Sequence, residues 1–202
     1  MPSGIMNIFR RPLEGQAKNV LQAAINTLKE RDLNGNVTSS LTSAGIESGV
    51  NIVTTINFAS LDQLESIHDG FANSEQQQDS WDETAAMCKS VSMEILEYVN
   101  PLESAPPGFN PKYMIRNVIT AKRGKTQELI DVLLEMQNGI EGLKPSILKP
   151  FGSSQRVRVS GVFDSLEEVS STLNDQNLPR TKIIDLSDSY RRSVSRIQYL
   201  NS

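Results

Sequence analysis

The sequence predicts an α+β fold in which a unit of four strands and two helices occurs twice, and three matches between the halves carry this prediction. The clearest match joins residues 57–66 to 162–171, where a phenylalanine, a serine, a leucine and a second serine recur 105 residues apart. In both copies an apolar run ends at the phenylalanine, and the serine two positions later opens a helix. Serine is a preferred N-cap, and the acidic residues after it suit the positive end of a helix dipole.

Two further matches keep the same order along the chain. The apolar helical positions 20, 21, 24 and 25 correspond to 129, 130, 133 and 134, which are 109 residues later. Lys-Ser-Val-Ser at 89–92 corresponds to Arg-Ser-Val-Ser at 192–195, which is 103 residues later. Three collinear matches with nearly equal spacing indicate one duplication followed by small changes in loop length.

Hydrophobic periodicity predicts the same element order in both halves. In the first half we expect strands at 5–9, 37–42, 51–58 and 90–99, helices at 16–31 and from Ser60 onward, a hairpin turn at 43–49, a polar tract at 73–80 and a short helix at 81–87. In the second half we expect strands at 113–120, 143–149, 155–163 and 193–200, helices at 125–138 and from Ser165 onward, and an irregular segment from 178.

A proline-rich stretch separates the halves. Residues 100–111 contain four prolines, which neither a helix nor a central strand accommodates. We therefore predict a first repeat at 1–100, a linker at 101–111 and a second repeat at 112–202.

The order strand, helix, strand, strand, helix, strand is that of a ferredoxin-like unit, whose antiparallel sheet carries both helices on one face. The other face needs a cover, and two tandem ferredoxin-like repeats can pack their sheets as an intrachain α/β barrel. This arrangement resembles the dimeric α/β-barrel superfamily, which includes antibiotic-biosynthesis-type monooxygenases, stress-responsive A/B barrels and the chlorite-dismutase group. The resemblance covers nearly the whole chain. It implies a small-molecule site in the barrel, for binding alone or for cofactor-independent oxidation of an activated substrate.

Strand parity predicts which side chains line the barrel, because alternate residues of a strand face opposite sides of the sheet. In the third strand of each half, the more apolar set that ends at the phenylalanine should face the helices, and the other set the barrel. In the strand at 113–120, the barrel set contains position 116. The predicted ligand-binding residues are Arg116, Arg156, Arg158, Asn51 and Asn57.

Buried guanidinium groups need partners. Glu94 or Glu97 on the fourth strand could pair with the three arginines, which would then be structural. Alternatively, the arginines would hold a ligand carboxylate through paired hydrogen bonds. The sequence leaves both interpretations open.

His68 is the only histidine, and it aligns with the apolar Leu173, so we expect it to face the core. A hydrogen-bonded structural histidine is one interpretation. The resemblance to chlorite dismutases offers a haem ligand as another, although that family carries its haem ligand in the second half. We expect no metal site and no other cofactor.

The haem-degrading members of the superfamily use an asparagine, a tryptophan and a histidine. Asn7, Trp81 and His68 are present here, but the last two occur in the reverse order, so we do not transfer that site. We predict instead that Trp81 is a packing or interface anchor. Cys88 has no evident base partner and is predicted to be a buried or inert thiol.

The composition of the chain limits the classes of partner and the location that we expect. The chain has 202 residues and a formal net charge of −4 without a basic run, which argues against nucleic acid and anionic membranes. No apolar stretch could span a bilayer and no signal peptide is evident, so a cytoplasmic location is expected. One cysteine excludes an intrachain disulfide.

Two functions from different classes remain. In the first, the barrel binds a small, anionic organic ligand, with cofactor-independent monooxygenase activity as its enzymatic form. In the second, the chain is a non-enzymatic interaction or homo-oligomerisation module whose barrel is filled by its own side chains. A haem-binding protein is a third alternative. Converging donors around an open pocket favour the first function, and paired arginines in a filled barrel favour the second.

Overall fold

A computed structural model describes residues 3–42, 50–100, 109–140, 143–174 and 179–201, and it confirms the duplicated α+β fold. The first half contains β1 (Gly4–Pro12), α1 (Ala17–Glu30), β2 (Gly35–Thr42), β3 (Ile52–Phe58), α2 (Leu61–Asn73), α3 (Glu75–Ala86) and β4 (Cys88–Tyr98). The second half contains β5 (Tyr113–Ala121), α4 (Thr126–Asn138), β6 (Ser146–Pro150), β7 (Arg156–Phe163), α5 (Leu166–Asn174), α6 (Arg180–Leu186) and β8 (Ser187–Asn201).

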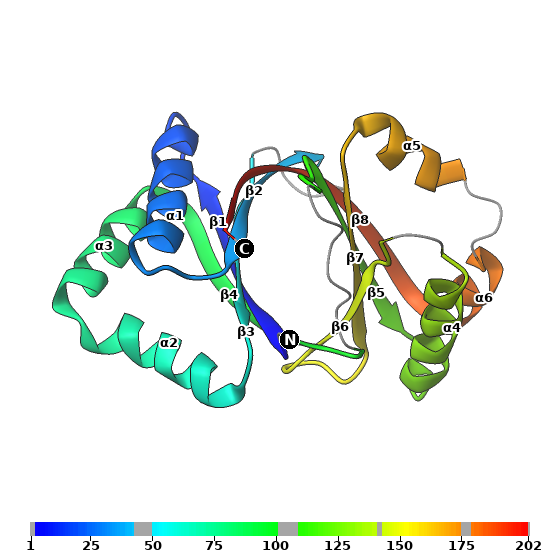
Figure 1. Ribbon diagram of the computed structural model, residues 1–202. Helices are drawn as coiled ribbons and strands as arrows, with labels where there is room; N and C mark the ends of the chain where they lie inside the picture. The colour runs from blue at the N-terminus through cyan, green and yellow to red at the C-terminus, as the bar shows by residue number, and fades with distance from the viewer. Residues whose placement is uncertain (1–2, 43–49, 101–108, 141–142, 175–178, 202) are drawn as a thin grey trace.

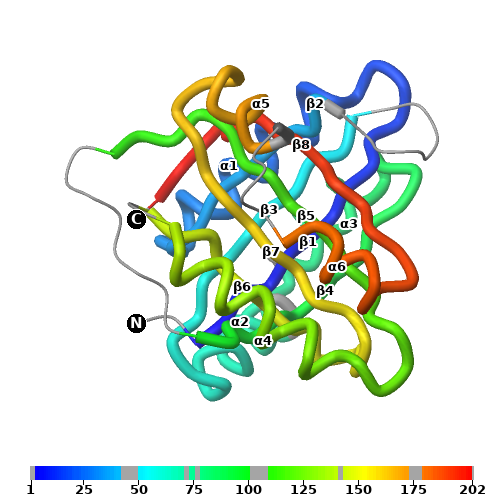
Figure 2. The backbone as a smooth tube through the Cα atoms, turned by 90° about the vertical axis from the view of Figure 1, so that its right-hand side faces the viewer, coloured from blue at the N-terminus to red at the C-terminus, as the bar shows by residue number. Residues whose placement is uncertain are grey.

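The eight strands form one closed antiparallel barrel in the order β1-β3-β2-β8-β5-β7-β6-β4. Within each half, the order of the four strands is that of a ferredoxin-like sheet. The two sheets join along β2 and β8 on one side and along β4 and β6 on the other, so the predicted intrachain barrel is confirmed. Figure 1 shows the sheets facing each other with the helices outside them. Figure 2 shows β7, β5 and β8 running side by side behind α4 and α6.

The repeated serines act as N-caps. Ser60 Oγ accepts a hydrogen bond from the Gln63 amide at 3.2 Å, and the Gln63 side chain accepts one from the Ala59 amide at 2.6 Å. Ser165 Oγ accepts from the Glu168 amide at 3.1 Å in the same way. This reciprocal arrangement satisfies amide groups that have no partner within the helix, and it fixes where α2 and α5 begin.

Each half has its own core between its sheet and its helices. The predicted apolar face of α1 is confirmed, because Val20, Ala24 and Leu28 are fully buried at helical spacing. Phe58 is buried in the same core. The third apolar cluster lies inside the barrel and consists of Ile5, Leu96 and Leu148, with Tyr98 packed against them.

Three predicted boundaries are wrong. α3 begins at Glu75, so the polar tract is helical, in keeping with the good helix propensity of glutamine. α6 occupies the segment that was expected to be irregular, and it packs Ile183 and Leu186 onto the second core. β8 begins at Ser187 rather than 193, because its first residues are exposed and polar and show no apolar alternation.

The predicted turn at 43–49 lies outside the described residues, as do residues 101–108 of the predicted linker. The domain boundaries therefore stay a prediction. In the part of the chain that the structure describes, no helix is long and apolar enough to cross a membrane.

Candidate functional site

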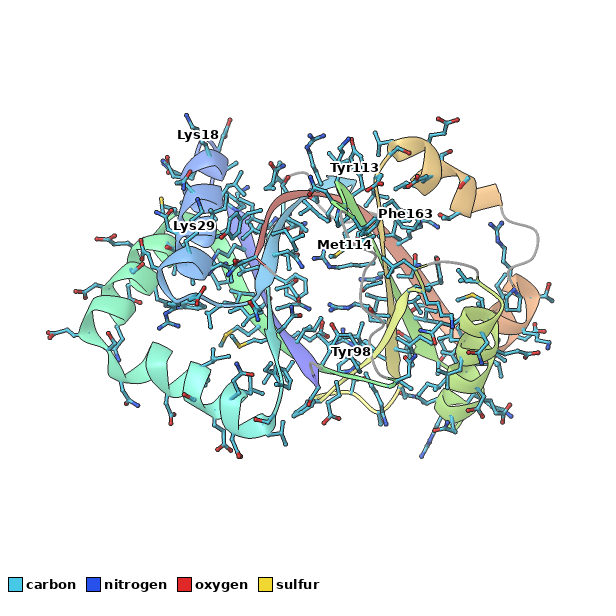
Figure 3. The ribbon with its side chains drawn as sticks, viewed as in Figure 1. Lys18, Lys29, Tyr98, Tyr113, Met114 and Phe163 are labelled. Atoms are coloured by element: carbon cyan, nitrogen blue, oxygen red, sulfur yellow. The ribbon has the colours of Figure 1, made fainter. Side chains whose placement is uncertain are left out.

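The predicted strand parity is confirmed, and it places two arginines deep inside the barrel. Ile52, Ile56 and Phe58 of β3 pack in the helix-side core, so the alternate positions of that strand face the barrel. The side chains of Arg116 and Arg158 are 5% and 3% exposed. Figure 3 labels Met114 and Tyr98, which lie between the two sheets.

Arg116, on β5, reaches β2 and β3 of the other half and the adjacent strand β8 of its own half. One of its terminal nitrogens, Nη2, donates to Thr38 Oγ1 at 3.1 Å and to Thr55 Oγ1 at 3.5 Å, and Nη1 donates to Ser195 Oγ at 3.4 Å. All three acceptors are hydroxyl oxygens of buried residues. Burial, and then the nearby positive charge of Arg158, lower the pKa of Arg116 to about 9.

Arg158 reaches from β7 to β1 and β4. The side-chain oxygen of Asn7 accepts from its Nη2 and Nη1 at 2.8 and 2.5 Å, an orientation of the amide that follows because a guanidinium can only donate. The Asn7 side-chain nitrogen then donates to Thr55 Oγ1 at 2.8 Å. Burial lowers the pKa of Arg158 to about 10, while Glu94 and Tyr98 act in the opposite direction.

Asn7 and Thr55 therefore connect the two guanidinium groups. Thr55 touches Arg116 on one side and Asn7 on the other, and Asn7 holds Arg158. Both residues are buried and belong to the first half, whereas both arginines belong to the second. The network thus crosses the barrel.

Glu94 of β4 forms ion pairs with both Arg156 and Arg158. It accepts from Arg156 Nη2 at 2.9 Å and lies 3.8 Å from Arg158 Nη1, which confirms one of the two predicted carboxylate partners. The side chains of Arg156 and Glu94 are 47% and 22% exposed, so this pair lies closer to solvent than Arg158 does. Among the described residues, Arg156 joins the buried network only through Glu94. Glu97, the alternative partner, is exposed.

Asn51 and Asn57 are half-buried, Asn51 just before β3 and Asn57 near its end. No hydrogen bond between described residues links their side chains to the three arginines. Their predicted ligand contacts stay a prediction.

Tyr98 adds a neutral hydroxyl beside Arg158. Burial raises the pKa of Tyr98 to about 12, with the positive charge of Arg158 opposing that rise. The phenol therefore stays protonated at neutral pH and can donate a hydrogen bond.

The expected core position of His68 is wrong. Leu64 and Ile67 bury one narrow side of α2, whereas His68 is exposed, as is Leu61, which lies seven residues earlier and on the same side of the helix. A histidine on the outer surface of α2 does not fit a haem group in the barrel. Among the described residues, no group of three or more histidine, cysteine or acidic side chains could hold a metal ion.

The predicted packing role of Trp81 is confirmed. It packs against the helix-side core of the first half, and its ring lies 5.7 Å from the guanidinium carbon of Arg10. Asn7 faces the barrel on the opposite side of that sheet, so the trio used by haem-degrading enzymes is not assembled. Cys88 is half-buried and donates to the Thr84 carbonyl at 3.2 Å, and burial raises its pKa, as expected of an unreactive thiol.

Strand parity placed Thr55 on the barrel side without naming it as a binding residue, and sequence reasoning also did not name four further residues of this network: Asn7, Thr38, Tyr98 and Ser195. A signal for Asn7 was present, because it stands 109 residues before Arg116, the spacing that relates the first strands of the two halves. The other three depend on how the barrel closes, which strand periodicity does not reveal.

No protein-family model and no curated protein matches the sequence. Solved structures match over almost the whole chain. A "putative monooxygenase" from Fusobacterium nucleatum matches with a TM-score of 0.77 and 9% identity, over 98% of this chain and 94% of that one. An anthrone oxidase-like protein matches with a TM-score of 0.65 and 14% identity, over 98% and 92%. A chlorite dismutase from Candidatus Nitrospira defluvii matches with a TM-score of 0.58 and 10% identity, over 100% and 93%. At such identities the likeness concerns the fold, and this chain has the fold of the dimeric α/β-barrel superfamily with both halves of the barrel in one polypeptide.

Proposed function

We propose that the barrel binds a small organic anion beside Arg116 and Arg158. One observation carries the proposal: within the described residues, Glu94 is the one carboxylate that pairs with Arg156 and Arg158, and Arg116 forms no ion pair at all. Arg116 has only hydroxyl oxygens as acceptors. A buried charge without a counter-charge destabilises the folded protein, and an anionic ligand would remove that penalty.

The hydrogen-bond inventory of the interior supports an anion in particular. A guanidinium only donates, and each hydroxyl that accepts from Arg116 keeps its own O–H for donation. Donors therefore outnumber acceptors around Arg116 and Arg158, and the buried Oδ1 of Asn36 is one acceptor there that has no partner among the described residues. A carboxylate or another oxyanion is the ligand type that such a surplus of donors binds best.

In its enzymatic form, this site would stabilise negative charge on a bound substrate while O₂ oxidises it. Tyr98 stays protonated at neutral pH, and Glu94 is held by two arginines, so the described interior offers no free general base. We therefore infer that a substrate would enter as its anion. The neighbours described as a monooxygenase and as anthrone oxidase-like support this reading as an analogy of fold.

Native mass spectrometry of the purified protein tests the proposal, together with urea unfolding in benzoate, acetate or chloride at equal ionic strength. We expect a retained organic acid, or a rise in the free energy of unfolding that grows with carboxylate concentration. Arg116→Met and Arg158→Met should abolish either effect. Arg10→Met is the matched control, because Arg10 is equally buried but hydrogen-bonds Thr54 on the helix side of the sheet.

An apo mass together with the same unfolding curve in all three salts would reject the proposal. That result would favour the interaction module, whose arginines are cross-barrel supports. Oxygen uptake that depends on an added carboxylate and is lost in Arg116→Met would separate catalysis from binding alone.

A further inference from the structure

Three buried polar atoms on the barrel side of the sheets have no hydrogen-bond partner among the described residues: Oδ1 of Asn36 on β2 and two atoms of β7. The two on β7 are Nε of Arg158 and Oγ of Ser160. The two residues are two positions apart on the strand, so both side chains project to the barrel side of the sheet. Buried donors without a partner are rare in native proteins and indicate a bound water, ion or ligand.

The hydrogen bonds of Arg158 show which of its edges is available. Asn7 occupies the end of the guanidinium, where it accepts from Nη1 and Nη2. The free donor, Nε–H, lies on the side edge of the group. A carboxylate binds such a side edge with one oxygen on Nε and reaches a neighbouring donor with the other. The Ser160 hydroxyl is that neighbouring donor.

Apolar side chains lie next to this edge. Leu148 faces Arg158 in the pairing of β6 with β7, and Tyr98 faces Leu148 in the pairing of β4 with β6. Ile5 and Leu96 complete the apolar cluster inside the barrel. A ligand with its charged group on β7 would therefore meet hydrocarbon and one aromatic ring.

We propose that the ligand is an organic carboxylate with an apolar body, and that its carboxylate binds the Nε edge of Arg158 and the hydroxyl of Ser160. This assignment rests on the proposed function and names the chemical class of its ligand. It also predicts one ligand per chain. The equivalent positions of the first half, 105 residues earlier, are Val53, which carries no charge, and Thr55, whose oxygen already accepts from Asn7 and Arg116.

The test follows the Nε–H resonances of ¹⁵N-labelled full-length protein during titration with benzoate, benzamide or phenylphosphonate at constant ionic strength. Arg158→Lys identifies the resonance of Arg158. We expect benzoate to shift it at one molar equivalent, with benzamide, the neutral analogue, giving no shift. Ser160→Ala should weaken benzoate binding about tenfold, as expected for the loss of one charge-assisted hydrogen bond.

Ser193→Ala is the matched control. Ser160 and Ser193 both lie opposite Arg116, on β7 and β8, but the Ser193 hydroxyl already donates to the Arg116 carbonyl at 3.4 Å. It should leave the affinity for benzoate unchanged. Tighter binding of phenylphosphonate, or unchanged affinity in Ser160→Ala, would overturn this assignment while leaving an anion-binding barrel in place. If no carboxylate binds at all, the proposed function fails with it, and water is the partner of the two free donors.

Discussion

Replacing Arg116 by methionine should make the ligand-free protein more stable while it removes anion binding. The side chain is 5% exposed, and burial together with the charge of Arg158 lowers its pKa to about 9. That fall corresponds to roughly 5 kcal/mol against the charged form. Three hydrogen bonds oppose this penalty, but only the bond to Thr38 at 3.1 Å has an ordinary length, and the other two measure 3.4 and 3.5 Å.

Hydrogen bonds to a charged group contribute about 1.5–3 kcal/mol when they are well formed, so this set recovers roughly 2–4 kcal/mol of the penalty. Methionine keeps much of the volume and leaves no charge. We therefore expect Arg116→Met to raise the free energy of unfolding by about 1–3 kcal/mol, the range seen when hydrophobic groups replace buried charges. Its urea midpoint should rise at an unchanged m-value.

Arg158→Met gives the contrast. It removes a guanidinium that has Asn7 and Glu94 as partners, and we expect a loss of about 2–4 kcal/mol because the side-chain oxygen of Asn7 is left unpaired and Glu94 keeps only Arg156. The reasoning is refuted if Arg116→Met unfolds at a lower urea concentration than the wild type. Arg116 would then be a structural support whose interactions outweigh its burial.

Further predictions concern the same barrel. Because the pKa of Tyr98 is about 12 in the folded protein and about 10 in the unfolded chain, its contribution to the free energy of unfolding is complete below pH 10 and is lost as the pH rises through about 12. Urea unfolding at several pH values should therefore show wild type losing roughly 2–3 kcal/mol of that free energy relative to Tyr98→Phe over this interval. Glu94→Gln leaves Arg156 and Arg158 without a carboxylate partner. Calorimetric titration should then show that benzoate binds to the variant several-fold more tightly than to wild type. The midpoint of urea unfolding should fall by an amount equivalent to about 1–3 kcal/mol, because two guanidinium groups have lost their counter-charge. Gly35→Ala places a methyl group onto the Thr55 backbone carbonyl, so thermal unfolding should show a loss of at least about 2 kcal/mol, and an unchanged melting temperature would contradict the register of β2 with β3.

The side of the sheet on which each arginine lies was predictable from the sequence, and the reason is geometric. A strand alternates its side chains with a period of two, so a single fixed residue sets the orientation of all the others. Phe58 and Phe163 provided that reference, because each stands two residues before a helix cap. Arg116 and Arg158 were placed inside the barrel on this basis, without knowledge of how the two sheets meet.

Which residues touch the arginines was not predictable in the same way. The contacts of Arg116 with Thr38 and Ser195 depend on how β2, β5 and β8 lie around the closed barrel, a property of the complete fold. The error at His68 has a different cause. Helical spacing indicates which residues share a side of α2, but the width of the buried stripe depends on how the helix lies against the sheet, and both His68 and Leu61 fall outside it.

The duplication itself explains how this barrel tolerates so many arginines. Two identical halves would place both copies of every interior arginine in the same space, and like charges at such distances repel strongly. Here the two halves have diverged: Arg116 corresponds to Asn7, and Arg158 corresponds to Val53. The second half supplies the cations, and the first supplies the neutral oxygen that holds Arg158 and the threonine that reaches Arg116. A single chain can therefore build one asymmetric, donor-rich interior, and this asymmetry is the physical reason to expect one anion in the barrel rather than two.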